Sequence, residues 1–236
     1  NIQLQKANDE LKSLDKLKRD FMMLVNHELK TPLTGICSYV QLLGEETLSD
    51  EPMLYVSKIH KNTQRLQDLI DDTLLITKLK ATNAPLEKDG VDIGELAQST
   101  WTQLHKEFAK KNHKLTLNPE NSFIQQVNAK YIGIILRKLM LNSLSHAKEG
   151  TNITYQLEEN EKKWTIHTEN QLSKELDKSP EELLNAFNTS EKILNHSGGT
   201  GLGLAVIQSI TKLFGGDLSI ESAGKNFSLR LTFPKI

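Results

Sequence analysis

The first 80 residues carry apolar positions spaced by three and four residues, as in a helix that buries one stripe. The first stripe runs from Leu4 to Val25 with charged residues between its members, and Lys18 interrupts it once. This is the pattern of a coiled-coil seam, and its helix is expected to continue to about Leu43. A second helix, to about Leu79, is predicted by the stripe Val56, Ile59, Thr63, Leu66, Ile70 and Thr73.

Between the two stripes, the segment GEETLSDEP is expected to form a loop, in which Ser49 or Asp50 caps the second helix. Two long helices joined in this way form a hairpin with little core of its own. We therefore expect a homodimer in which two hairpins build a four-helix bundle. The alternative is a monomeric hairpin docked on the rest of the chain.

The spacing of apolar and polar residues changes after a linker, ATNAP, at 81–85. We expect a helical domain over 1–80 and a second domain over 86–236. In the second domain, helices are predicted within 91–112, from 129 to about 148, and after a loop up to 214. Strands are predicted at 114–118, 122–128, 151–159, 162–170, 216–222 and 227–233. The expected fold is an all-α hairpin followed by an α+β two-layer sandwich, with helices on one face of a sheet.

Composition limits the classes of partner and the cellular compartment to be expected. The 236 residues have a net charge of −1, so no basic field would attract nucleic acid or an anionic membrane. Cys37 is the single cysteine, which fits a reducing, cytoplasmic location. No run of 18 apolar residues is present, and the chain begins without Met inside a helical pattern. It is expected to be part of a longer protein, attached to a membrane only through segments outside this chain.

The first helix contains the run HELKTP at 27–32, preceded by Phe21 and followed by Gly35. A neutral imidazole is a nucleophile near pH 7, and its phosphoramidate can pass a phosphoryl group to an aspartate. Glu28 can hold the other ring N–H of His27 or take its proton. A His-Glu pair alone would more often be ordinary helix surface. In its full context, on a coiled-coil helix before a hairpin, the run resembles the phosphoacceptor box of two-component sensor histidine kinases.

Two further residues of this run have physical consequences. Pro32 removes a helical N–H and clashes with the carbonyl four residues earlier, so a bend is predicted one turn beyond His27. Thr31 shares a helical face with His27. The resemblance implies that Thr31 orients water for dephosphorylation of a partner aspartate.

A glycine-rich run, GGTGLGLA at 198–205, leads into an amphipathic helix. Glycines let backbone N–H groups approach phosphate closely, and a helix N-terminus favours negative charge. A flexible loop is the alternative for one such run. The segment resembles the second glycine box of the ATP-binding domain of these kinases, which implies nucleotide contacts at Gly199, Gly201 and Gly203.

Upstream, ILRKLMLNSLSHAKEG at 135–150 resembles the asparagine box of the same domain. The resemblance implies that the amide oxygen of Asn142 helps hold Mg²⁺ against the triphosphate, and such a hard cation takes oxygen ligands. It also places His146, one turn later, toward the nucleotide. By itself, Asn142 would be read as a solvent-facing amide.

The asparagine box departs from the family pattern at three positions. Lys138 stands where another Asn is usual, Ser143 where Ala is usual, and Ser145 where a basic residue is usual. Lys138 or Lys148 is a candidate to compensate for the missing positive charge.

The larger departure is at the first glycine box, where the family has Asp-x-Gly-x-Gly and the Asp accepts a hydrogen bond from the adenine amino group. Here the five residues are NQLSK, so Asn170 is a neutral acceptor and both glycines are replaced. A shift of one residue would put Glu169 in the Asp position. Strand alternation would then point its side chain to the wrong face.

The resemblance covers nearly the whole chain, and Phe187 is either the phenylalanine of the F-box or ordinary core. It implies a GHKL-type ATPase domain, ATP and Mg²⁺ as cofactors, autophosphorylation of His27, and transfer to an aspartate of a response-regulator receiver domain. The competing hypothesis is a non-catalytic dimeric scaffold or phosphotransfer module that has lost productive ATP binding. The altered first glycine box is its main support.

Overall fold

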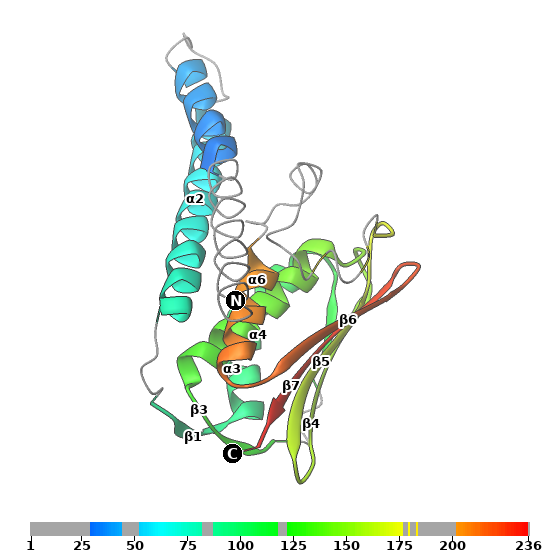
Figure 1. Cartoon of the computed structure of the whole chain (residues 1–236). Helices are drawn as coiled ribbons and strands as arrows, with labels where there is room; N and C mark the ends of the chain where they lie inside the picture. Colours follow the sequence, from blue (N-terminus) through cyan, green and yellow to red (C-terminus); the bar gives the residue numbers. More distant parts are fainter. Residues whose placement is uncertain are drawn as a thin grey trace, which may run out of the picture. The chain divides into compact units, whose positions relative to one another are not determined.

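The computed structural model of this protein describes residues 29–43, 52–81, 87–117, 122–176, 179, 183 and 202–235. The chain divides into two compact units, whose main segments meet between Leu74 and Leu75 (Figure 1). The first is helical, and the second combines helices and strands. The predicted coiled-coil stripe up to Val25 lies outside the described residues.

The helical unit is a hairpin. Its described parts are a helix over 29–43 and α2 (Pro52–Ala81), close to the predicted ends at Leu43 and Leu79. A methyl group on Gly35 would come within 2.9 Å of the Asn62 side chain. Further along, the rings of Tyr39 and Tyr55 stack with centroids 6.0 Å apart. From the first contact to the second, the residue number rises on the helix over 29–43 and falls on α2, so the two helices are antiparallel.

The stripe predicted on α2 is only partly covered in the single chain, since Ile59, Leu66 and Thr73 are half-buried. Tyr55 and Asn62 make the contacts within the hairpin, whereas Val56 and Ile70, which belong to the stripe, are 51% and 41% exposed. Large apolar side chains are exposed along both helices. They are Leu33, Val40, Leu42, Leu54, Val56, Ile70 and Leu74.

The second unit is built on a five-stranded sheet with the strand order β2-β4-β5-β7-β6. β2 runs parallel to β4, and every other neighbouring pair is antiparallel. α3 (Ile93–Lys110), α4 (Ala129–His146) and α6 (Gly203–Leu213) lie on one side of the sheet (Figure 1). The strands are β2 (Lys114–Leu117), β4 (Asn152–Glu159), β5 (Lys163–Gln171), β6 (Asp217–Ala223) and β7 (Asn226–Pro234). This confirms the predicted two layers, the adjacent strands and the closing hairpin.

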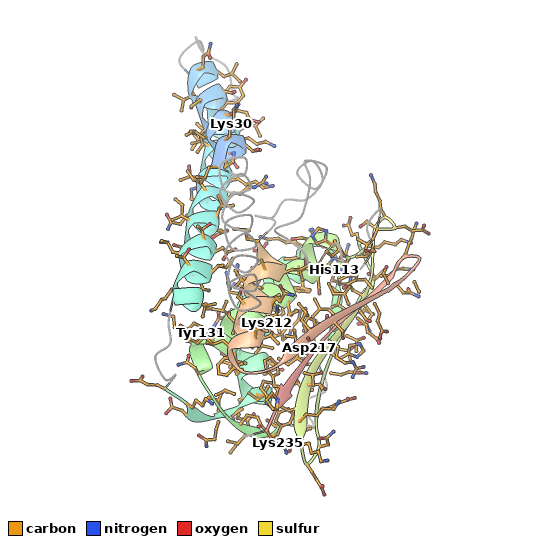
Figure 2. All side chains as sticks on the ribbon, in the orientation of Figure 1. Lys30, His113, Tyr131, Lys212, Asp217 and Lys235 are labelled. Carbon is orange, nitrogen blue, oxygen red and sulfur yellow. The ribbon has the colours of Figure 1, made fainter. Side chains whose placement is uncertain are left out.

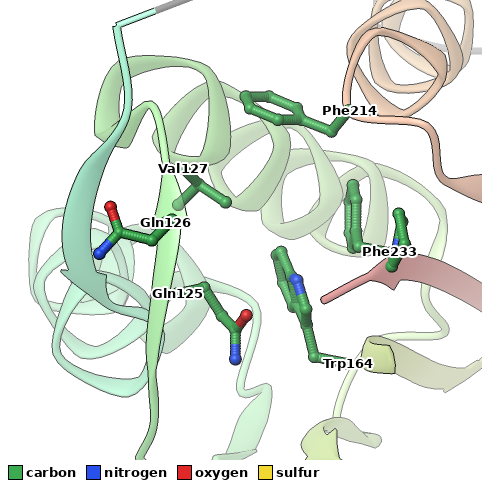
Figure 3. A pocket seen from close by; sticks show the side chains of 7 residues that line it. Gln125, Gln126, Val127, Trp164, Phe214 and Phe233 are labelled. Carbon is green, nitrogen blue, oxygen red and sulfur yellow. The ribbon is translucent and has the colours of Figure 1, made fainter. Parts of the chain in front are cut away.

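The core follows from strand alternation, because residues at every second position of the strands face the helices. An aromatic group closes one end of it. The rings of Trp164 and Phe233 stack with centroids 4.2 Å apart, and Phe123 packs edge-on at 6.0 Å from Trp164. Figure 3 shows the rings of Trp164 and Phe233 beside Gln125 and Val127. The cavity among them is about 10 Å³, room for one water molecule and no larger ligand.

One strand was not predicted. β1 (Asp89–Asp92) pairs antiparallel with β3 (Ile124–Val127) in a separate two-stranded sheet. The expected helical segment began at Val91, yet Val91 and Asp92 belong to this strand. The helix starts only at Ile93 because Asp92 is its N-cap, whose carboxylate accepts a hydrogen bond from the Glu95 N–H at 2.9 Å.

The N-cap gives a stability prediction. The Ser122 hydroxyl and the Glu95 N–H both donate to Asp92 and lower the pKa of its carboxyl group. Asp92→Ala is expected to destabilise this unit by about 1 kcal/mol at pH 7. Because the folded-state pKa lies below the unfolded one, the contribution is complete above the unfolded pKa and is lost as pH falls through the folded pKa. Urea unfolding of both proteins at pH 7 and pH 2 should show the difference shrinking in acid. An unchanged difference would contradict the role of the charge.

None of the helices in the described part of the chain is both long enough and apolar enough to span a membrane.

Candidate functional site

The end of α4 is tied to the end of β5 by backbone hydrogen bonds. Ser173 N–H donates to the carbonyl of His146 at 3.2 Å, and Lys148 N–H donates to the carbonyl of Gln171 at 2.7 Å. Ala147 and Leu172 form an isolated β-bridge between these two contacts. The structure therefore brings together two segments that the sequence singled out separately, the asparagine box and the altered first glycine box.

The start of α6 reaches the same region. The rings of Tyr131, at the start of α4, and Phe214, just after α6, pack edge to face with centroids 6.5 Å apart. Tyr131 and Lys212 mark these two helix ends in Figure 2. The two helices pack against each other, and this pairing of ends indicates that they are antiparallel. α6 has 11 residues, which puts its first residue, Gly203, level with about Asn142 on α4.

Asn142 and His146 are four residues apart on α4 and share one helical face. The Asn142 side chain is half-buried, and no described residue forms a hydrogen bond with it. His146 keeps a large accessible surface. Even so, the protein atoms packed around its imidazole lower the pKa of the ring, and the nearby Lys111 ammonium lowers it further. The ring is therefore predominantly neutral at pH 7 and able to accept a hydrogen bond or to stack.

Lys111 is a positively charged group that the sequence did not single out. Its Nζ donates to the carbonyl of Leu144 at 2.7 Å, in the last turn of α4. A cation in this place is favourable, because the last carbonyls of a helix carry partial negative charge. Lys111 follows α3 directly, and the packing of α3 against α4 brings it here, together with a hydrogen bond from the Gly150 N–H to the Lys111 carbonyl at 3.2 Å. Compensation by Lys138 or Lys148 stays a prediction.

Asn170 is buried on the helix-covered face of the sheet and is 7% exposed. Its neighbours in the sheet are Ile153 on β4 and Phe227 on β7, both apolar and buried. The Nδ2 atom of Asn170 is buried and has no hydrogen-bond partner. Glu169 instead lies on the opposite face of the sheet, where its side chain is 56% exposed. The register that puts Asn170, and not Glu169, on the inner face is thus confirmed.

Leu172 and Ser173 follow the end of β5, where the family pattern has its first glycine box. Leu172 is buried, 4% exposed, and its N–H donates to the carbonyl of Lys225 at 2.7 Å. On α4, the Ser143 hydroxyl lies 3.0 Å from the hydroxyl of Tyr155 on β4. The extra hydroxyl at Ser143, where the family has Ala, is therefore satisfied within the core.

The open face of the sheet holds a hollow of about 700 Å³ at the same end. Strand alternation puts most of its lining side chains on the face away from the helices. They include Asn152, Thr154, Glu169, Gln171, Glu221 and Ser228. Asn170 of the candidate site is also among the residues that line this hollow.

Several residues singled out from the sequence lie outside the described residues: His27, Glu28, Phe187, Gly199 and Gly201. Thr31 is described and is exposed on the helix over 29–43. The site is therefore described in its ATPase half, through Asn142, His146, Asn170 and Gly203.

Two family models match the chain. The model of the His kinase A phospho-acceptor domain matches residues 4–82. The model of the histidine kinase-, DNA gyrase B- and HSP90-like ATPase matches residues 128–235, which include every described site residue of the second unit.

Curated relatives support the same family. The chain is 25% identical over its full length to the sensor histidine kinase GacS of Pseudomonas protegens, and 24% identical over 95% of its length to WalK of Bacillus subtilis. It spans 27% and 38% of these two proteins.

Among solved structures, the histidine kinase AdeS of Acinetobacter baumannii matches with a TM-score of 0.71 at 17% identity, covering 89% of this chain and 98% of AdeS. The histidine kinase ThkA, in complex with the response regulator protein TrrA, matches with a TM-score of 0.74 at 17% identity, covering 99% and 66%. These likenesses support the fold. Together with the two family models and the relatives, they show that the chain belongs to the sensor histidine kinases and contains the phosphoacceptor and ATPase domains of their catalytic core.

Proposed function

We propose that this chain uses ATP with Mg²⁺ to phosphorylate His27 and then passes the phosphoryl group to an aspartate of a response-regulator receiver domain. The observation that carries the proposal is the convergence of three segments in the ATPase domain. Backbone hydrogen bonds join the end of α4 to the end of β5, and the antiparallel packing of α6 on α4 puts the start of α6 level with the same turn. The Nδ2 atom of Asn170 is buried there without a hydrogen-bond partner. We assign the phosphoacceptor domain to 1–80, the linker to 81–85 and the ATPase domain to 86–236.

The described residues fit a nucleotide. Asn170 offers a buried, unpartnered amide to the base, and His146 offers a neutral ring beside it. The backbone N–H groups at the start of α6, beginning at Gly203, fit phosphate oxygens, and Gly199 and Gly201 would extend this contact. Asn142, whose carboxamide has no hydrogen-bond partner within the described segments, is the proposed magnesium ligand, because Mg²⁺ commonly combines one protein oxygen with phosphate and water oxygens.

The reaction needs an imidazole nitrogen of His27 in line with the γ-phosphorus. As the new N–P bond forms, the bond between that phosphorus and the bridging oxygen breaks, and ADP leaves with the electron pair. Glu28 would hold the second ring N–H of His27 and stabilise its positive charge. Mg²⁺ supplies charge neutralisation when bound, and the protein supplies mainly positioning. The proposed role of Thr31 is to orient water when the partner aspartate is dephosphorylated, and its exposure on the helix over 29–43 is compatible with that role.

We further propose that the phosphoacceptor domain forms the homodimer. Val56 and Ile70 of the predicted stripe are exposed in the single chain. In a hairpin with little core, such a stripe fits a second copy in a four-helix bundle. The proposed location is the cytoplasm. The complex of ThkA with the response regulator TrrA supports a receiver domain as the second partner.

Incubation of the chain with γ-labelled ATP and Mg²⁺ tests the proposed function. The expected product is protein-bound label that is lost in acid and stable in base, as a phosphoramidate is. Transfer of this label to a receiver domain would support the second step. No label and no ATP binding at millimolar concentration would favour the non-catalytic scaffold instead.

Asn142→Ala is expected to lower the initial rate of labelling by at least about tenfold, since the proposed magnesium ligand is lost. The defect should shrink as the Mg²⁺ concentration is raised. Asn160→Ala, in the exposed turn between β4 and β5, is the control. Equal rates in the Asn142 and Asn160 variants at low Mg²⁺ would rule out this role.

A further inference from the structure

The side chain of Asn170 can donate a hydrogen bond, which a carboxylate in its place could not. It is 93% buried between two apolar neighbours, Ile153 and Phe227, and its Nδ2 atom has no acceptor. A buried amide donor without a partner is costly, so it favours any ligand that brings an acceptor. The carboxamide offers one donor and one acceptor side by side, whereas a carboxylate offers acceptors only.

The edges of the purine bases match this pair in different ways. Adenine presents an amino donor beside the N1 acceptor. Guanine presents the O6 acceptor beside the N1–H donor, which is the reverse order. A carboxamide matches adenine in one orientation and guanine after a half-turn about its terminal torsion, because this exchanges its oxygen and nitrogen.

The surroundings of Asn170 leave this half-turn open. Neither Ile153 nor Phe227 carries a side-chain polar atom, and no described residue hydrogen-bonds to the carboxamide to fix one orientation. The Ser143 hydroxyl, the buried polar group of α4 in this region, is already engaged by Tyr155. The orientation of the amide is therefore set by the ligand.

We propose that Asn170 reads the base by two hydrogen bonds and that this site accepts guanine nucleotides as well as adenine nucleotides. The proposal rests on the proposed function, because it requires the base to contact Asn170. It makes Asn170 the residue that determines base specificity in this chain.

Calorimetric titration of the full chain with the imidodiphosphate analogues of ATP and GTP, in the presence of Mg²⁺, tests the proposal. The two dissociation constants are expected to differ by less than about tenfold, the discrimination that one bidentate contact typically gives. In Asn170→Leu, which keeps the approximate size of the side chain and removes both polar atoms, both analogues should bind at least about tenfold more weakly. Asn226→Leu makes the same change on the opposite, exposed face of β7 and should leave both dissociation constants unchanged.

The outcomes separate the two proposals. Tight binding of the adenine analogue with the guanine analogue bound more than about tenfold more weakly would overturn dual recognition and leave the kinase function intact. Failure of both analogues to bind would overturn both. If Asn170→Leu is unstable by thermal unfolding, Asn170→Ala replaces it. That variant should weaken both analogues alike, and unchanged affinities would show that Asn170 does not contact the base.

Discussion

Replacing His27 with Gln is expected to abolish the acid-labile label completely while ATP binding persists. The amide of Gln has about the size of an imidazole but no nucleophilic nitrogen, so no phosphoramidate can form. The nucleotide residues proposed for the second unit, Asn142, His146 and Asn170, are unchanged in this variant. Titration with the ATP analogue and autoradiography after acid and base treatment give the two readouts.

The matched control is His60→Gln, an exposed histidine on α2 in the same hairpin. It should be labelled at the wild-type rate. Label that persists in His27→Gln would assign the phosphoacceptor to another residue. Loss of label in both variants would point to a damaged hairpin, which circular dichroism of α2 and its partner helix would reveal.

Trp164→Ala is expected to destabilise the ATPase domain by about 3 to 5 kcal/mol. Trp164 is 1% exposed, stacks on Phe233 at 4.2 Å and contacts Phe123 edge-on. Its removal would therefore leave a large cavity on the buried face of the sheet. The variant retains Trp101, whose fluorescence follows urea unfolding of this domain apart from the helical hairpin.

Trp101→Ala is the comparison. Trp101 is half-buried and packs edge-on against Phe108 at 4.9 Å, so a loss of only about 1 to 2 kcal/mol is expected. In that variant, Trp164 reports unfolding instead. Equal losses in the two variants would mean that the ring stack of Trp164 and Phe233 contributes little beyond ordinary burial.

Much of the fold could be predicted from the sequence because most elements have a clear period. The hairpin and the strands β4 to β7 show regular spacing of apolar positions, and the structure has them close to the predicted bounds. β1 was missed because its four residues, DGVD, show no alternation of apolar and polar side chains and include one strand-forming residue, Val91. Its pairing with β3 comes from tertiary contact, which a local pattern does not contain.

The same division applies to the site. Asn142, His146 and Gly203 could be located because each belongs to a motif with local spacing, and the alternation of β5 settled which of Glu169 and Asn170 faces inward. Lys111 could not be located in this way. It reaches the end of α4 across 33 residues of sequence, and nothing near it in the chain marks the carbonyl it contacts.

The two units differ in the surface that they expose. Within the described parts of the chain, every exposed large apolar side chain except Ile124 lies on the hairpin, between Leu33 and Leu74. If the hairpin closes its core only against a second copy, its melting temperature rises with protein concentration by mass action. The ATPase domain, with its own core, would melt at a temperature independent of concentration. Dilution would therefore separate the two transitions. The dimeric hairpin would unfold at a lower temperature, and the ATPase domain would stay folded there.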